Sequence, residues 1–152
     1  MTRGRGNSYE ERVLHPKVEE KLREQQYANI VHEAAIDVAA WKEKGWKQPL
    51  RMDFFAEKNG EKYLVEVKPY CGGSWMALTQ GLGEALGYKS LLEDCGHKLI
   101  INGKEMSIKE IKIILAIEVA KGYQSVYEQI WEGMRKNLKE GTVEILWVPK
   151  EG

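Results

Sequence analysis

Residues 51–68 read RMDFFAEKNGEKYLVEVK, and this stretch predicts a β-hairpin. Two runs rich in aromatic and β-branched residues flank Asn59-Gly60, a dipeptide typical of a two-residue type I′ turn. A turn of two residues fixes the register of the paired strands, so we expect Phe54 opposite Val65. The other predicted elements are placed around this hairpin.

The same register brings charged groups together. It places Asp53 opposite Glu66 and Arg51 opposite Lys68, and Lys68 projects from the same strand face as Glu66. Opposed residues have Cβ atoms about 4.5–5.5 Å apart, where like charges are destabilising. A divalent cation such as Mg²⁺ would relieve this repulsion, because hard cations bind carboxylate oxygens. The alternative is that both carboxylates lie at a solvated strand end, which predicts no metal binding.

Length and composition indicate one globular domain. The chain has 152 residues, of which 43% are hydrophobic and 30% charged, as in ordinary globular proteins. We expect residues 1–8 to form a flexible segment and residues 9–152 a single domain. The 23 basic and 23 acidic residues balance, so any basic surface for a nucleic acid must be local.

The sequence also excludes several classes of protein. Its two cysteines show no CxxC spacing, so neither a disulfide framework nor a zinc site is implied. The N-terminus lacks the apolar core of a secretory signal, and no apolar run is long enough to span a bilayer. We therefore expect a cytoplasmic protein without membrane contact.

The order of the remaining elements predicts an α/β fold. Pro16 suits the first turn of a helix, and the polar run to about Gln26 fits a solvated helix or the start of a helix. Apolar residues at spacings of three and four predict an amphipathic helix over 27–44. After the hairpin we expect a helix over 74–93, a strand over 111–118, a helix over 122–138 and a strand over 143–148. Such alternation is typical of a central mixed β-sheet flanked by helices on both faces.

The helix predicted over 74–93 carries a polar stripe. Gln80, Glu84 and Tyr88 recur at intervals of four residues, and Lys89 lies beside them. Three glycines within 81–87 weaken this helix by close to 1 kcal/mol each relative to alanine. We expect them to admit the close approach of a strand or of a ligand backbone.

Taken in chain order, the acidic residues and the lysine resemble the pattern of the PD-(D/E)xK nuclease superfamily. That pattern has a glutamate on the first helix, an aspartate opening one strand, and (Asp/Glu)-x-Lys on the next strand. Glu33, Asp53 and Glu66-Val67-Lys68 fill these places. Met52 stands where the family often has proline.

The stripe on the following helix extends the resemblance. Gln80 and Tyr88 are similar to an addition found in the RecB-type and resolvase-like branches. The likeness covers about Tyr27 to Leu92 and implies a restriction-endonuclease-like fold, dependence on Mg²⁺ or Mn²⁺, and hydrolysis of phosphodiester bonds in DNA.

The resemblance also implies roles for single residues. Asp53 and Glu66 would hold the metal with the Val67 carbonyl, and Glu33 would hold a second metal or support a water on the first. Lys68 would assist the attack of water. The implied catalytic set is Glu33, Asp53, Glu66, Lys68 and Gln80, and the implied nucleic-acid contacts are Arg51, Tyr88 and Lys89.

Two other functions stay open at this stage. One is a nucleic-acid-binding or scaffolding protein that keeps the nuclease fold without cleaving. The other is a small α/β domain that binds an acidic metabolite or a partner protein and no metal. For a nuclease of this size we expect structure-selective or weakly sequence-selective cleavage of DNA by a homodimer with twofold symmetry, so that two sites cut two strands.

Overall fold

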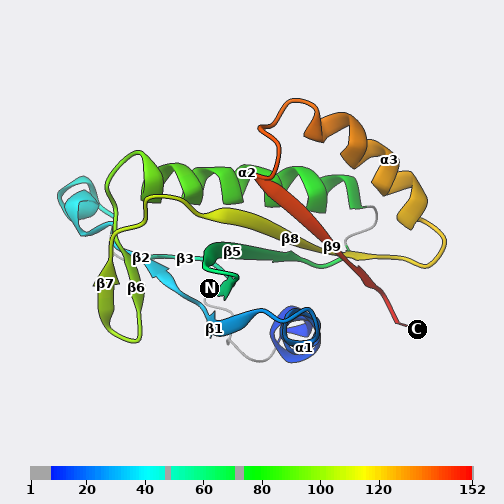
Figure 1. Cartoon of the computed structure of the whole chain (residues 1–152), viewed down its shortest axis with the longest axis horizontal. Helices are drawn as coiled ribbons and strands as arrows, with labels where there is room; N and C mark the ends of the chain where they lie inside the picture. The colour runs from blue at the N-terminus through cyan, green and yellow to red at the C-terminus, as the bar shows by residue number, and fades with distance from the viewer. Residues whose placement is uncertain (1–7, 47–48, 71–73, 152) are drawn as a thin grey trace.

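The structure, a computed structural model, describes residues 8–46, 49–70 and 74–151. They form an α/β fold with a mixed five-stranded sheet and a smaller antiparallel four-stranded sheet (Figure 1). The predicted flexible segment lies outside the described residues except for Ser8. The elements are η1 Glu10–Leu14, α1 His15–Glu24, β1 Ala28–His32, β2 Ala35–Ile36, η2 Ala39–Lys44, β3 Leu50–Arg51, β4 Phe54–Lys58, β5 Glu61–Lys68, α2 Ser74–Glu93, β6 Leu99–Ile101, β7 Lys104–Met106, β8 Lys112–Val119, α3 Gln124–Arg135 and β9 Val143–Pro149.

The larger sheet has the strand order β1-β4-β5-β8-β9. Strands β1, β4 and β5 pair antiparallel, whereas β5, β8 and β9 pair parallel. Helix α2 lies between β5 and β8 in the chain, and α3 lies between β8 and β9, as parallel neighbours require a crossover. The predicted mixed sheet is therefore confirmed.

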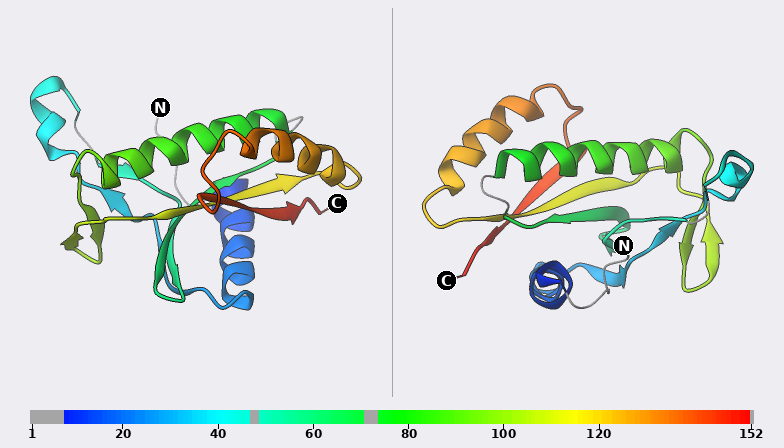
Figure 2. Two further views of the ribbon diagram at one scale, coloured as in Figure 1. Left: turned by 45° about the horizontal axis from the view of Figure 1, so that its top comes forward. Right: turned by 180° about the vertical axis from the view of Figure 1, so that it is seen from behind.

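Helices cover both faces of this sheet, as predicted: α1 lies on one side, and α2 and α3 lie on the other (Figure 2). The α1 side buries one apolar cluster, which includes Leu14, Val18 and Val65. The α2 side buries a second cluster, which includes Leu78 and Leu115. Among the described helices, none combines the length and the apolar character needed to cross a bilayer.

The hairpin has the predicted turn and register. Asn59 and Gly60 both adopt positive φ, 53° and 78°, as a type I′ turn requires. Phe54 pairs with Val65, and the ladder continues to the turn. The local turn chemistry thus places β4 against β5 correctly.

The helix predicted over 27–44 is wrong. This segment forms β1, β2 and the short helix η2, and Asn29 and Glu33 adopt positive φ, which an α-helix excludes. A register shift between Ala28 and Val31 interrupts the pairing of β1 with β4. The irregularity breaks the period of two that a strand normally shows, so the apolar spacing imitates a helix. Pairing with β4, which is remote in sequence, overrides the local pattern.

The predicted position of Arg51 opposite Lys68 is also wrong. Arg51 belongs to β3, which leaves the larger sheet and pairs with Ala35 of β2 in the smaller one. The antiparallel ribbon passes from one sheet to the other through two backbone hydrogen bonds. Met52 N donates to Ala34 O at 3.0 Å, and Glu33 N donates to Asp53 O at 2.9 Å. The bend thus falls directly at Asp53.

Candidate metal centre

Asp53 and Glu66 lie together at the end of the β4–β5 ladder. The Asp53 backbone N–H donates to Glu66 Oε2 at 3.0 Å. In return, Asp53 Oδ2 accepts a hydrogen bond from Val67 N at 2.7 Å. Each carboxylate is thus bound to the backbone of the opposite strand, and the predicted pair of acids is present.

Both carboxyl groups are withdrawn from water. The Glu66 residue is 2% exposed and the Asp53 side chain 23%. Burial raises the pKa of both acids above the usual range, and the Asp53 charge raises the pKa of Glu66 further. Binding a proton or a cation is therefore more favourable for Asp53 and Glu66 than leaving both carboxylates ionised and unpaired.

The Val67 carbonyl is suitably placed to add an oxygen ligand. The N–H and the carbonyl of one strand residue point to the same side of the strand. Since Val67 N points to the Asp53 carboxylate, the Val67 carbonyl also faces the β4 side. The predicted ligand positions Asp53, Glu66 and Val67 thus meet at one edge of β5.

Lys68 extends from the end of β5 to helix α2. Its ammonium donates to Glu84 Oε1 at 2.8 Å, and its side chain is 19% exposed. Burial by itself would lower the pKa of Lys68. The hydrogen bond to Glu84 and the charges of Glu84, Glu66 and Asp53 outweigh it and raise the pKa. Lys68 therefore stays charged at neutral pH.

One of the three glycines of α2 admits this lysine. A Cβ atom at Gly81 would lie 3.2 Å from Lys68 Cγ, which is closer than ordinary van der Waals contact. The predicted close approach is thus confirmed at Gly81. No strand approaches Gly83 or Gly87, where a Cβ would meet no described atom within 4 Å, so the approach of a ligand backbone stays a prediction there.

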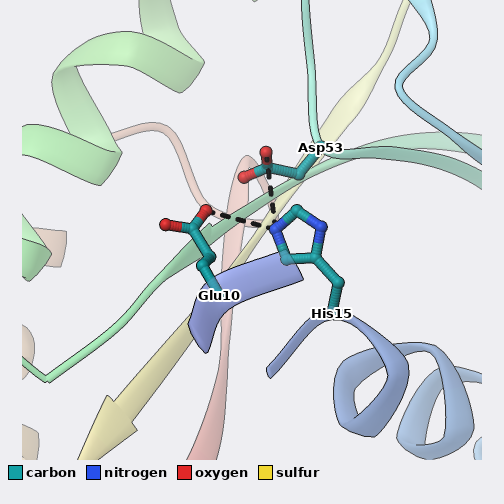
Figure 3. Close-up of side chains that lie close together, drawn as sticks. All are labelled: Glu10, His15 and Asp53. Atoms are coloured by element: carbon teal, nitrogen blue, oxygen red, sulfur yellow. Dashed lines mark hydrogen bonds and ion pairs between the residues drawn. The ribbon is translucent and has the colours of Figure 1, made fainter. Parts of the chain in front are cut away.

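A second group of donors meets Asp53 from the other side of the sheet (Figure 3). His15 Nε2 lies 3.2 Å from Glu10 Oε2 and 3.7 Å from Asp53 Oδ1. One donor atom from each residue lies within 4.8 Å of the others. His15 is 3% exposed, and its Nδ1 lies 2.8 Å from Nε2 of His32. A neighbour at the second ring nitrogen is the usual way to orient a metal-binding histidine.

Glu10 and His15 were not predicted as site residues. The polar run to Gln26 predicts a solvated helix, but Leu14, Val18 and Leu22 are fully buried against the sheet. Glu10 precedes this series at the same interval of four residues, and His15 follows Leu14 directly. The apolar stripe was the signal that this helix packs against the core and brings polar residues with it.

The other predicted site residues occupy varied positions. Glu33 lies in the turn between β1 and β2 rather than on a helix, and its backbone N–H donates to Asp53 O. Tyr88 lies on α2 one turn after Glu84, and burial and then the charges of Glu66 and Glu84 raise its pKa. Glu84, which was not predicted to belong to the site, holds the Lys68 ammonium.

Gln80 and Lys89 flank this part of α2. Gln80 lies one turn before Glu84, with an exposed side chain. The Lys89 ammonium donates to Glu93 and to the carbonyl of Ile111, so it is engaged inside the fold. The structure therefore leaves Gln80 accessible to a ligand and gives Lys89 a structural contact.

Searches against protein-family models, curated proteins and solved structures find no match to this chain. Carboxylate oxygens suit Mg²⁺ and Mn²⁺, and an imidazole nitrogen is a better ligand for Mn²⁺ than for Mg²⁺. Glu10, His15 and Asp53 bring together donors of the kind that bind such a cation, and Glu66 adds a carboxylate beside Asp53 from the other side.

Proposed function

We propose that this protein is a divalent-metal-dependent nuclease that hydrolyses phosphodiester bonds in DNA, on a restriction-endonuclease-like fold. The observation that carries the proposal is the position of Asp53. Its carboxylate lies at the bend between two sheets, between buried Glu66 and the Glu10–His15 pair. Lys68 supplies a fixed positive charge two residues beyond Glu66.

Asp53 would hold Mg²⁺ or Mn²⁺ with Glu66 and the Val67 carbonyl on one side, and Glu10 and His15 would add ligands to Asp53 on the other. When bound, such a cation polarises a phosphodiester and lowers the pKa of water. The raised pKa values of the two buried acids agree with this role, because a bound cation would stabilise the ionised form of both.

Lys68 would act by its charge. Glu84 holds the ammonium group at 2.8 Å and helps to keep it protonated, which makes Lys68 a poor general base. A fixed ammonium stabilises the negative charge that grows on phosphate oxygens in the transition state. Gln80 and Tyr88 lie along the same helix, where they would orient the DNA backbone beside the acids.

DNA binding needs a local surface, because the net charge of the chain is zero. Exposed Arg51 on the smaller sheet is a candidate phosphate contact. We further propose a homodimer, so that two sites act on two strands. Light scattering at micromolar concentration tests the dimer, and a monomer would contradict it.

Cleavage of supercoiled and branched DNA in Mg²⁺ or Mn²⁺ tests the proposed function. We expect wild-type protein to cut, and Asp53→Ala and Lys68→Ala to lose about 10²–10³ in rate, the usual cost of losing one electrostatic stabiliser. Lys62→Ala is the matched control, since Lys62 lies on the same strand near the turn. Cleavage by Asp53→Ala at the wild-type rate would indicate a contaminating nuclease and overturn the proposal.

Measuring DNA binding and metal binding beside cleavage separates the alternatives. DNA binding without cleavage in every metal would favour a nucleic-acid-binding or scaffolding protein. Absence of both metal binding and DNA binding would favour a domain for an acidic metabolite or a partner protein.

A further inference from the structure

Glu118 of β8 is a fully buried acid that the proposed chemistry does not use. It lies on the sheet face that carries Ile114 and Ala116, which belong to the apolar cluster against α1. A carboxylate in such a place is costly unless hydrogen bonds satisfy it. Glu118 therefore needs a reason for its position.

Its two oxygens bind two separate segments of the chain. Glu118 Oε1 accepts a hydrogen bond from Tyr70 N at 2.9 Å. Glu118 Oε2 accepts a hydrogen bond from the hydroxyl of Tyr9.

Both segments lead directly to the candidate metal centre. Tyr9 precedes Glu10, and Tyr70 follows Lys68 by two residues. The C-terminal segment closes the cluster, since Lys150 Nζ lies 5.1 Å from the Tyr9 ring centre and 5.9 Å from that of Tyr70. One buried carboxylate thus ties the start of the first helix to the end of β5.

We propose that Glu118 is a positioning residue for the metal centre. It holds Tyr9, and through the adjoining backbone it fixes Glu10 beside His15 and Asp53. It also holds the Tyr70 N–H, which fixes the chain that leaves β5 after Lys68. The inference rests on the proposed function, because it assumes that Glu10 takes part in binding a divalent cation.

The expected effect is a loss of metal affinity rather than a general loss of stability. Removing a group that orients a metal ligand typically costs 10–100-fold in affinity. We expect Tyr9→Phe to weaken Mn²⁺ binding about 10-fold and Glu118→Ala 10–100-fold. Glu118→Gln should bind Mn²⁺ nearly as tightly as wild type, because its amide oxygen can accept from Tyr70 N and its amide nitrogen can donate to the Tyr9 oxygen.

Titration of the full chain with Mn²⁺ alone, followed by the electron paramagnetic resonance signal of free Mn²⁺, measures this affinity. Tyr27→Phe is the matched control, because the Tyr27 hydroxyl bonds to Glu144 and not to Glu118. Thermal unfolding of each variant in EDTA reports stability separately. A double variant, Tyr9→Phe with Glu118→Ala, should bind Mn²⁺ no more weakly than Glu118→Ala alone. The hydrogen bond that Tyr9→Phe removes is already lost in Glu118→Ala.

The outcomes distinguish the two levels of the proposal. If wild type binds no Mn²⁺, the metal centre itself is wrong. If wild type binds Mn²⁺ but Tyr9→Phe and Glu118→Ala bind as tightly as Tyr27→Phe, the positioning role is overturned. Should Glu118→Ala fail to fold, Tyr9→Phe decides alone, since it removes a single hydroxyl group.

Discussion

Replacing Glu66 by glutamine should stabilise the metal-free protein, although it removes a proposed metal ligand. Glutamine has the shape of glutamate, and its amide oxygen can still accept the hydrogen bond from Asp53 N. What disappears is one of two buried negative charges. The expected result is a gain in stability without metal and a loss of metal binding.

The magnitude follows from Coulomb's law. Two unit charges about 5 Å apart repel by about 3 kcal/mol at an effective dielectric constant of 20. Near pH 8 folded Glu66 escapes this repulsion by binding a proton, and proton uptake costs up to about 1.4 kcal/mol for each pH unit above the ordinary pKa. We therefore expect Glu66→Gln to gain about 2–3 kcal/mol near pH 8. For a chain of this size that corresponds to about 5–10 °C in melting temperature.

The gain must depend on pH. The pKa of Glu66 is raised in the folded state, so the folded protein binds a proton that the unfolded chain has released. The contribution of Glu66 to stability is therefore fully present below about pH 4.3, the ordinary pKa of glutamate, and is lost as the pH rises toward the raised pKa of the folded state. Glu66→Gln lacks this dependence, so its advantage should be largest at pH 8 and vanish near pH 4.5.

Thermal unfolding in EDTA at pH 4.5, 6 and 8 measures the effect, with Mn²⁺ added in a parallel series. Wild type should gain about 2.7 kcal/mol at 100 times the dissociation constant, and Glu66→Gln should gain less. Glu61→Gln on the same strand is the control, because Glu61 is exposed and paired with Lys112. A Glu66→Gln variant that melts below wild type at pH 8, or differs from it equally at every pH, would refute the electrostatic reasoning.

Three further changes test the surroundings of the site. Gly83→Ala should stabilise α2 by up to about 1 kcal/mol, whereas Gly81→Ala should gain less, because its Cβ would lie 3.2 Å from Lys68 Cγ. Only Gly81→Ala should slow DNA cleavage, about 10-fold, because its Cβ displaces Lys68; equal rates in both variants would contradict this. Glu84→Gln removes a charge that raises the pKa of Glu66, so the acidic limb of the pH–rate profile for DNA cleavage should move to lower pH. An unchanged acidic limb would show that ionisation of Glu66 does not control the rate. Phe54→Ala should cost about 3–5 kcal/mol in urea unfolding, since Phe54 is 1% exposed in the α1-side core, and a loss below 1 kcal/mol would contradict that packing.

The sequence predicted the elements whose signals are local. The Asn59-Gly60 turn fixes the hairpin register within a few residues, and this alone brings Asp53 to Glu66. The helix predicted over 74–93 coincides with α2, and the strand predicted over 143–148 agrees with β9 to one residue. The residues that specify these elements, the turn dipeptide and the apolar spacing, lie inside the elements or next to them.

The rest depends on contacts between distant segments. Asn29 and Glu33 adopt positive φ because β1 must pair with β4 and then turn into β2, and no local pattern announces this. Glu10 and His15 reach Asp53 only because α1 docks against the sheet. The register alone would have continued the hairpin to Arg51, whereas β3 leaves to pair with β2.

The bend at Asp53 joins the two sheets through one antiparallel ribbon. The chain enters the smaller sheet through Ala34 and leaves it through Met52, and these two residues are hydrogen-bonded to each other. Any tilt of the smaller sheet therefore rotates the backbone that carries the Asp53 carboxylate. A ligand that binds the smaller sheet would thus change the orientation of the Asp53 carboxylate without contacting it.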